Sequence, residues 1–191
     1  MRRPRKNVRK TAWHEAGHAV HALEVGMPFA GVWVRLDSDE VPPGGLADRL
    51  DAGVTPMGAV LRVEEPIYNV SDYDLIANCM AGLAGERILR GTKTAGKFTP
   101  LAYSSGCAGD WAAAKSYIEQ HNAEGKSKFL YLDRIVNRAV ESAWKLLKEC
   151  SRAHKAVAEA LIERGYLSHE ECLRIAKAAA AAPLEVAPRD L

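Results

Sequence analysis

The sequence predicts a mostly α fold of the α+β class, and three observations support this. The pattern from residue 130 to residue 182 is helical almost throughout, and three shorter helical segments precede it. Only two short runs are rich in β-branched and aromatic residues, so the sheet should be small. The 191 residues, 48% of them hydrophobic and 26% charged, suit one folded domain that needs no metal merely to hold itself together.

The first predicted helix covers the run TAWHEAGHAVHALEVG. Thr11 is its candidate N-cap, and Gly26, followed by Met27 and Pro28, ends it. Residues 1–10 contain six basic groups and no acidic group. We interpret this segment as either a flexible basic arm or the fraying start of the helix.

Two strands and a second helix follow. The strands are expected at Ala30–Leu36 and Gly58–Val63, each bounded by acidic or Pro- and Gly-containing turns. The helix should span Ser71–Arg90, with Ser71 and Asp74 as a pair resembling a capping box. Gly91 should end it.

The rest of the chain is expected to be a loop followed by helices. Residues 91–107 show no clear period, and a helix should begin near residues 108–110 and end at about His121. The helical C-terminal half is broken around Gly165–Leu167. After that break, Ser168 and Glu171 form a full capping-box signature for the last helix. We therefore expect a basic arm at 1–10, one domain at 11–182 and a tail at 183–191.

Composition also bears on location. No window reaches the roughly 18 consecutive apolar residues of a membrane span, and the basic start is not followed by the apolar stretch of a signal peptide. The four cysteines lie far apart and form no CxxC pair, so reduced thiols are expected. These features predict a cytoplasmic protein without a membrane span.

The segment His14-Glu15-Ala16-Gly17-His18 is the most informative motif, an HExxH on a predicted helix. Residues at i and i+4 lie on one face of a helix, so both imidazoles can bind one Zn²⁺. The intervening Glu15 can then take a proton from the metal-activated water that attacks a peptide carbonyl. A chance HExxH would arise in about one such sequence in a hundred, and the helical context makes coincidence a weaker explanation.

A catalytic zinc ion needs a third protein ligand and an open fourth position. His21 lies seven residues beyond His14, about 10 Å along a helix, which is too far for both to bind one ion. It is expected to be packed or at the surface. Two acidic candidates remain open on chemistry alone, Glu86 and Asp110.

The sequence offers further candidate ligands. Cys107 lies three residues before Asp110, and its thiolate could replace or join the carboxylate, but a small loop residue is the preferred interpretation. His121, His154 and His169 lie in polar helical or cap contexts and are expected at the surface.

Three blocks of sequence resemble the peptidase domain of the FtsH-type ATP-dependent zinc metalloproteases. They are TAWHEAGHAV at 11–20, AGLAGERILRG at 81–91 and SGCAGDW at 105–111, in the same order and at similar spacing. The resemblance extends from about residue 11 to residue 179. It implies a helical zinc-metallopeptidase domain with a small β-sheet near the active site and a helical C-terminal half.

The resemblance also implies roles for individual residues. It makes His14 and His18 zinc ligands, Glu15 the general base, and Asp110 the third ligand. It gives Glu86 the task of orienting a ligand imidazole. It further implies that the strand with Gly58, Ala59, Val60 and Leu61 is an exposed edge to which an extended polypeptide substrate adds.

Family members carry an AAA+ unfoldase before the peptidase, whereas only ten residues precede Thr11 here and no GxxxxGK[ST] phosphate loop occurs. We therefore expect a zinc metalloendopeptidase without its own ATPase, cutting flexible or unfolded proteins. A separate unfoldase and a homo-oligomeric ring are its candidate partners.

Two alternatives were weighed. The chain could be a non-catalytic interaction or regulatory protein that joins an FtsH-like assembly, although nothing structural requires Glu15. It could also bind nucleic acid or an anionic surface through the basic arm. That role is disfavoured because no recognition helix or aromatic-interleaved pattern accompanies the arm.

Overall fold

The computed structural model describes residues 6–36, 58–62, 70–97, 107–123 and 132–182. Within these ranges the chain forms six helices and three strands. In chain order they are α1 (Lys6–Glu24), β1 (Phe29–Val34), β2 (Gly58–Arg62), α2 (Asp72–Leu89), α3 (Ala108–Ala123), α4 (Leu132–Glu149), α5 (Ser151–Arg164), β3 (Tyr166–Ser168) and α6 (His169–Ala181). The mostly α, α+β class expected from the sequence is confirmed.

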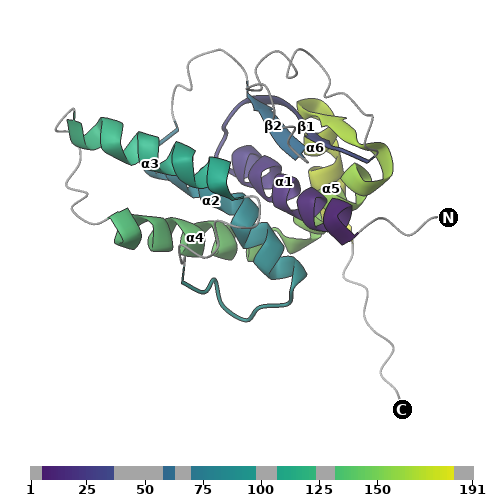
Figure 1. Ribbon diagram of the computed structural model, residues 1–191. Helices are drawn as coiled ribbons and strands as arrows, with labels where there is room; N and C mark the ends of the chain where they lie inside the picture. The colour runs from purple at the N-terminus through teal and green to yellow at the C-terminus, as the bar shows by residue number, and fades with distance from the viewer. Residues whose placement is uncertain (1–5, 37–57, 63–69, 98–106, 124–131, 183–191) are drawn as a thin grey trace.

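Helix α1 lies at the centre of the molecule (Figure 1). Helix α2 packs along α1 and also contacts α3 and α4. Helix α5 and strand β1 pack against other sides of α1. The three strands form an antiparallel sheet in the order β2-β1-β3. The helix that carries the HExxH motif therefore lies between a group of helices and the sheet with α5 and α6.

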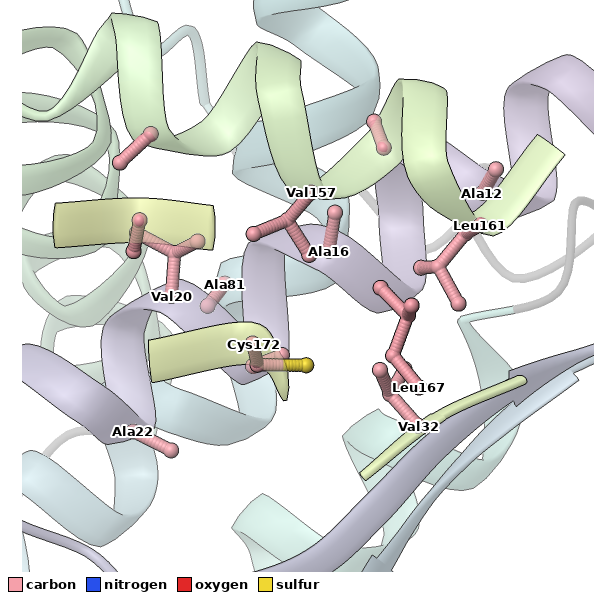
Figure 2. Packing of buried hydrophobic residues seen from close by; sticks show 14 of the residues in the cluster. Ala12, Ala16, Val20, Ala22, Val32, Ala81, Val157, Leu161, Leu167 and Cys172 are labelled. Carbon is pink, nitrogen blue, oxygen red and sulfur yellow. The ribbon is translucent and has the colours of Figure 1, made fainter. Parts of the chain in front are cut away.

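The buried apolar residues form two clusters. Figure 2 shows the first, in which small residues of α1, such as Ala12 and Ala16, lie near Val157 and Leu161 of α5. The second cluster joins α2, α3 and α4. Small side chains on α1 permit short distances between helix axes, which brings its polar residues close to groups on its neighbours.

Helix α1 begins at Lys6, so the prediction that Thr11 is its N-cap was wrong. Val8 is 5% exposed and belongs to the same cluster as Ala12, which extends the buried face backwards. Lys10 forms an ion pair with Glu86 of α2, with 3.2 Å between Nζ and Oε2. Residues 6–10 are thus part of the helix. Residues 1–5 and the tail expected at 183–191 lie outside the described residues.

The other boundaries agree closely with the sequence. Ser71 caps α2 by accepting a hydrogen bond from the Asp74 amide (3.1 Å), and Gly91 has a φ of 71° just after its end. Ser168 and Glu171 form the expected capping box of α6. The expected breaker at 165–167 contributes β3, which pairs with β1. A further interruption at Cys150, between α4 and α5, was not predicted.

The sheet is close to the expected one. β1 spans Phe29–Val34 instead of Ala30–Leu36, and β2 ends at Arg62, with Val63 outside the described residues. A side chain at Gly31 would lie 2.6 Å from the Tyr166 hydroxyl, so glycine allows the Tyr166 ring to cross β1. Among the described helices, none has both the length and the apolar character that crossing a membrane requires.

We predict that Gly17→Ala destabilises the protein by roughly 1–3 kcal/mol, because the new methyl group overpacks the α1–α2 contact. A Cβ at this position would lie 2.5 Å from the backbone carbonyl oxygen of Ala81, which cannot rotate away. Urea unfolding with excess chelator measures the change. Gly109→Ala in α3 is the matched control, because its Cβ meets nothing within 4 Å. Equal stability of the two variants would contradict the prediction.

Candidate metal centre

Three helices supply the candidate metal centre. His14, Glu15 and His18 lie on α1, Glu86 and Asn78 on α2, and Asp110 in the first turn of α3. His14, Glu15 and His18 are all buried, with 6–7% of their surface exposed. The imidazoles of His14 and His18 lie against α2 at Gly82, where a Cβ would lie 2.3 Å from His14 Nε2 and 2.5 Å from His18 Nε2. Glycine at position 82 therefore provides the space in which the two rings meet.

The Nε2 atoms of the two histidines and the Asp110 carboxylate converge. The His14 and His18 Nε2 atoms are 3.1 Å apart. His14 Nε2 lies 2.9 Å from Asp110 Oδ2, and His18 Nε2 lies 3.4 Å from Asp110 Oδ1. An ion held at about 2.0–2.1 Å by four tetrahedral ligands separates neighbouring ligand atoms by ~3.3 Å. The observed separations are close to this value.

The opposite nitrogen of each ring has its own partner. His18 Nδ1 lies 2.6 Å from the backbone carbonyl oxygen of Asn78, which can only accept, so Nδ1 carries the hydrogen. The Asn78 side chain returns a hydrogen bond of 2.9 Å to the His18 carbonyl. His14 Nδ1 lies 3.1 Å from Glu86 Oε1. In this way α2 fixes the orientation of both rings.

Glu86 is an ionised acceptor. Burial disfavours its charge, but His14 and Lys10 outweigh this effect and hold its pKa below the usual value. Arg90 adds a further contact of 3.1 Å to Oε2. A carboxylate only accepts hydrogen bonds, so Nδ1 of His14 also carries its hydrogen. With Nδ1 engaged in this way, each of the two rings turns its Nε2 atom toward the shared space.

The close approach of these acceptor atoms favours a cation between them. Two Nε2 lone pairs and a carboxylate repel one another at these distances unless a proton or a metal ion lies among them. Asp110 Oδ2 is buried and has no hydrogen-bond partner of acceptable geometry. The donor set of two imidazoles and one carboxylate is one that proteins use for zinc. These residues therefore fit a divalent metal ion.

The shifted pKa values of His14 and Asp110 also indicate that positive charge is favoured here. Burial opposes charge on His14, but its interactions with Asp110, Cys107 and Glu86 outweigh burial and raise its pKa well above the usual value. For Asp110 burial also opposes ionisation, yet the neighbouring His18 and His14 hold its pKa well below the usual range. The carboxylate thus stays ionised, and positive charge is favoured beside it.

Glu15 has a different environment. It is 7% exposed, and burial raises its pKa, partly offset by the charges of His14 and His18. A carboxylate with a raised pKa is a better proton acceptor than one in water. Glu15 is therefore suited to proton transfer beside the centre.

The structure separates the two acidic residues that sequence chemistry left open. Asp110 faces the Nε2 atoms of both histidines, whereas Glu86 contacts the far nitrogen of His14. His21 was expected to be either packed or at the surface. It is packed, with 1% of its surface exposed, and lies near Asn78. Strand β2, with Gly58, Ala59, Val60 and Leu61, pairs with β1 and lies at one end of the strand order. Its role in substrate binding stays a prediction.

Sequence reasoning missed three features of the site. Asn78 was not considered, although it lies on the helix that carries Glu86. Cys107 was interpreted as a small loop residue, but it is 1% exposed and forms a group with His14 and Asp110. His154 was expected at the surface, which was wrong, because it is fully buried.

His154 supports the motif from α5. Its Nε2 lies 2.9 Å from the carbonyl oxygen of Trp13, the residue before His14, and the two rings meet edge to face at 4.9 Å. Because a carbonyl only accepts, Nε2 donates this hydrogen bond. Burial lowers the pKa of His154 to about 4, so the imidazole is neutral at pH 7.

Comparisons with known proteins do not assign a family. No family model matches the chain, and no curated protein matches it.

We predict that Glu86→Gln weakens binding of a divalent metal by about 10–100-fold, because His14 loses the carboxylate that orients its ring. Competition titration with a chromophoric chelator measures the affinity. Glu141→Gln on α4 is the control, since Glu141 pairs only with exposed Lys145 among the ion pairs of the described residues. Unchanged affinity in Glu86→Gln would show that Glu86 serves only Lys10 and Arg90.

We also predict that His154 makes the protein less stable in acid. The unfolded chain takes up a proton near pH 6.5, whereas the folded protein does so only near pH 4. Stability contributed by neutral His154 is therefore complete above pH 6.5 and declines between pH 6.5 and pH 4. Between pH 7 and pH 5, wild type should lose roughly 2 kcal/mol more than His154→Gln, which does not titrate. Urea unfolding across this range tests the difference, and parallel curves would contradict it.

Proposed function

We propose that the chain is a zinc metalloendopeptidase that hydrolyses peptide bonds of flexible or unfolded proteins. The observation that carries this proposal is the convergence of His14 Nε2, His18 Nε2 and the Asp110 carboxylate within 3.4 Å, with both Nδ1 atoms engaged elsewhere. Three protein ligands leave one position for water or substrate, which is the pattern of a catalytic zinc site.

His14, His18 and Asp110 would hold the ion. When bound, Zn²⁺ supplies Lewis acidity and brings the pKa of a coordinated water close to neutrality. Glu86 and the Asn78 carbonyl keep the imidazoles in the tautomer that leaves Nε2 free for the ion. The His14 and Lys10 contacts keep Glu86 ionised for this task.

Glu15 would act as general base and acid. It follows His14 directly on α1, and its raised pKa lets it accept a proton during attack on the peptide carbonyl. The same carboxylic acid can then return the proton to the leaving amine. A Gln side chain at this position could hydrogen-bond but could not carry the proton.

The resemblance to the FtsH-type peptidases adds support. The three blocks that carry it lie far apart in the sequence, and each supplies part of the cluster. The first holds His14, Glu15 and His18, the second Glu86, and the third Asp110. Groups from all three are within hydrogen-bonding distance of His14. A chance HExxH gives no reason for these distant acidic residues to meet it.

The remaining features of the proposal concern substrate and partners. Strand β2 would accept an extended polypeptide as an added strand, since edge strands carry unpaired backbone groups. A separate unfoldase would supply unfolded chains, and a homo-oligomeric ring would enclose them. All four cysteines are free thiols, which suits the reducing cytoplasm.

We predict that Glu15→Gln retains zinc and loses casein cleavage by about 10²–10⁴-fold, the usual contribution of a general base. Elemental analysis measures zinc, and peptide release from casein measures activity. The exposed substitution Glu141→Gln should leave both unchanged. Cleavage by Glu15→Gln at the wild-type rate would refute the peptidase mechanism. A fully active wild type without bound zinc would refute the metal centre.

A further inference from the structure

Cys107 adds a fourth donor to the candidate metal centre. It immediately precedes α3, and its carbonyl accepts the first hydrogen bond of that helix, from the Trp111 amide at 3.0 Å. The Cys107 Sγ, a His14 ring nitrogen and an Asp110 carboxylate oxygen all lie within 4.8 Å of one another. His14 and Asp110 also contact His18. Cys107 therefore joins two of the three proposed ligands, and those two also contact the third, His18.

A cationic side chain of α2, Arg87, interacts with Cys107. Arg87 donates hydrogen bonds to the carbonyls of Ala95, Gly96 and Lys97, which fix its position on α2. Its guanidinium interacts electrostatically with Cys107, and Cys107 also interacts with His14. The thiolate is the form of cysteine that binds metals, and a bound ion itself favours that form.

The other cysteines have different settings. Burial raises the pKa of Cys172 to about 12 and that of Cys150 to about 11, so both remain thiols at neutral pH. Cys79 lies in the same apolar cluster of α2, α3 and α4 as Cys107, but it is not grouped with metal-binding side chains. Of the cysteines in the described residues, Cys107 is the one grouped with metal-binding side chains.

Cys107 itself is buried, but the chain just after it is exposed. The next two residues, Ala108 and Gly109, are exposed, and a Cβ at Gly109 would meet no atom within 4 Å. The start of α3 is therefore loosely packed on its outer side. A small displacement there would carry Sγ away from His14 while the rest of α3 stays in contact with α2.

We propose that Cys107 is a fourth, releasable ligand that closes the metal centre of His14, His18 and Asp110 in the resting protein. Zinc sites with four protein ligands are closed and structural, whereas sites with three are open and catalytic. Binding of Cys107 makes the centre latent, and its withdrawal opens the position that a substrate requires. This inference rests on the proposed metallopeptidase function and adds its regulation.

Cobalt spectroscopy on the full chain tests the coordination directly. Co²⁺ replaces Zn²⁺ in such sites, its visible d–d bands report binding, and a near-ultraviolet charge-transfer band reports a thiolate ligand. We expect both features in wild type and in the control Cys150→Ser. Cys107→Ser should keep the d–d bands and lose the charge-transfer band.

Each of the other possible spectral outcomes would overturn a specific claim. Wild-type d–d bands without charge transfer would overturn ligation by Cys107 and leave the proposed function standing. No cobalt or zinc binding at all would overturn the metal centre and with it both proposals. Loss of the charge-transfer band in Cys150→Ser, with retention in Cys107→Ser, would assign the thiolate to the wrong cysteine for this inference.

A second measurement needs no variant. Bound Zn²⁺ should slow iodoacetamide alkylation of Cys107 in wild type, as followed by mass spectrometry of its peptide. An alkylation rate that zinc leaves unchanged would overturn the proposal. This readout remains valid if Cys107→Ser folds poorly.

Activity separates latency from simple ligation. Zinc-loaded Cys107→Ser should cleave casein several-fold faster than wild type, and the additional substitution Glu15→Gln should abolish this gain. Equal or slower cleavage with zinc retained would overturn the closure of the site by Cys107. Absence of cleavage in both proteins, with the charge-transfer band present in cobalt-loaded wild type, would refute the peptidase function but keep the ligand assignment.

Discussion

The short distance between α1 and α2 is the constraint on which the other features depend. A Cβ on Gly17 or Gly82 would collide with the opposite helix or with the imidazoles between the helices. Gly85 is equally restricted, because its Cβ would lie 2.4 Å from the Trp13 carbonyl oxygen. Glycine is costly inside a helix by roughly 1 kcal/mol relative to alanine, so three of them at one contact indicate a strong steric requirement. The requirement is space for polar groups between two helices.

This arrangement buries an unusual amount of charge for one small region. Lys10, Glu86, His14 and Asp110 form a continuous series of contacts from the edge of α1 to the start of α3. Buried charges destabilise a fold unless each has partners, and hydrophobic replacements often do as well for stability alone. Such clusters are typical of sites where function opposes stability. The polar interior here is better explained by chemistry than by folding.

Local features of the structure could be predicted from the sequence, because their causes are local. The i, i+4 spacing places His14 and His18 together on any helix, and Ser71 and Ser168 act within a single turn. The true start of α1 also had a signal, since Val8 precedes Ala12 and Ala16 by multiples of four and continues the buried face. The burial of His154 also had a sequence signal, because His154 lies beside Ala153 and three residues before Val157 on the apolar face of α5.

Other features depend on tertiary packing. Glu86 and Asp110 are both acidic residues near glycines, and only the positions of α2 and α3 decide which nitrogen of His14 each one faces. The three residues of β3 are too few to show a period, and they form a strand because β1 lies beside them. The burial of Cys107 was equally hidden, because its neighbours His14 and Arg87 come from α1 and α2.

The hydrogen bond between His154 and Trp13 joins residues 141 positions apart, and this has a consequence for the order in which the chain is made. Helix α1 is synthesised before the surfaces of α2 and α5 on which it packs. Until those helices have been made, the apolar face of α1 lacks these native partners. A nascent fragment that ends before α5 therefore lacks the His154 hydrogen bond that supports the HExxH helix.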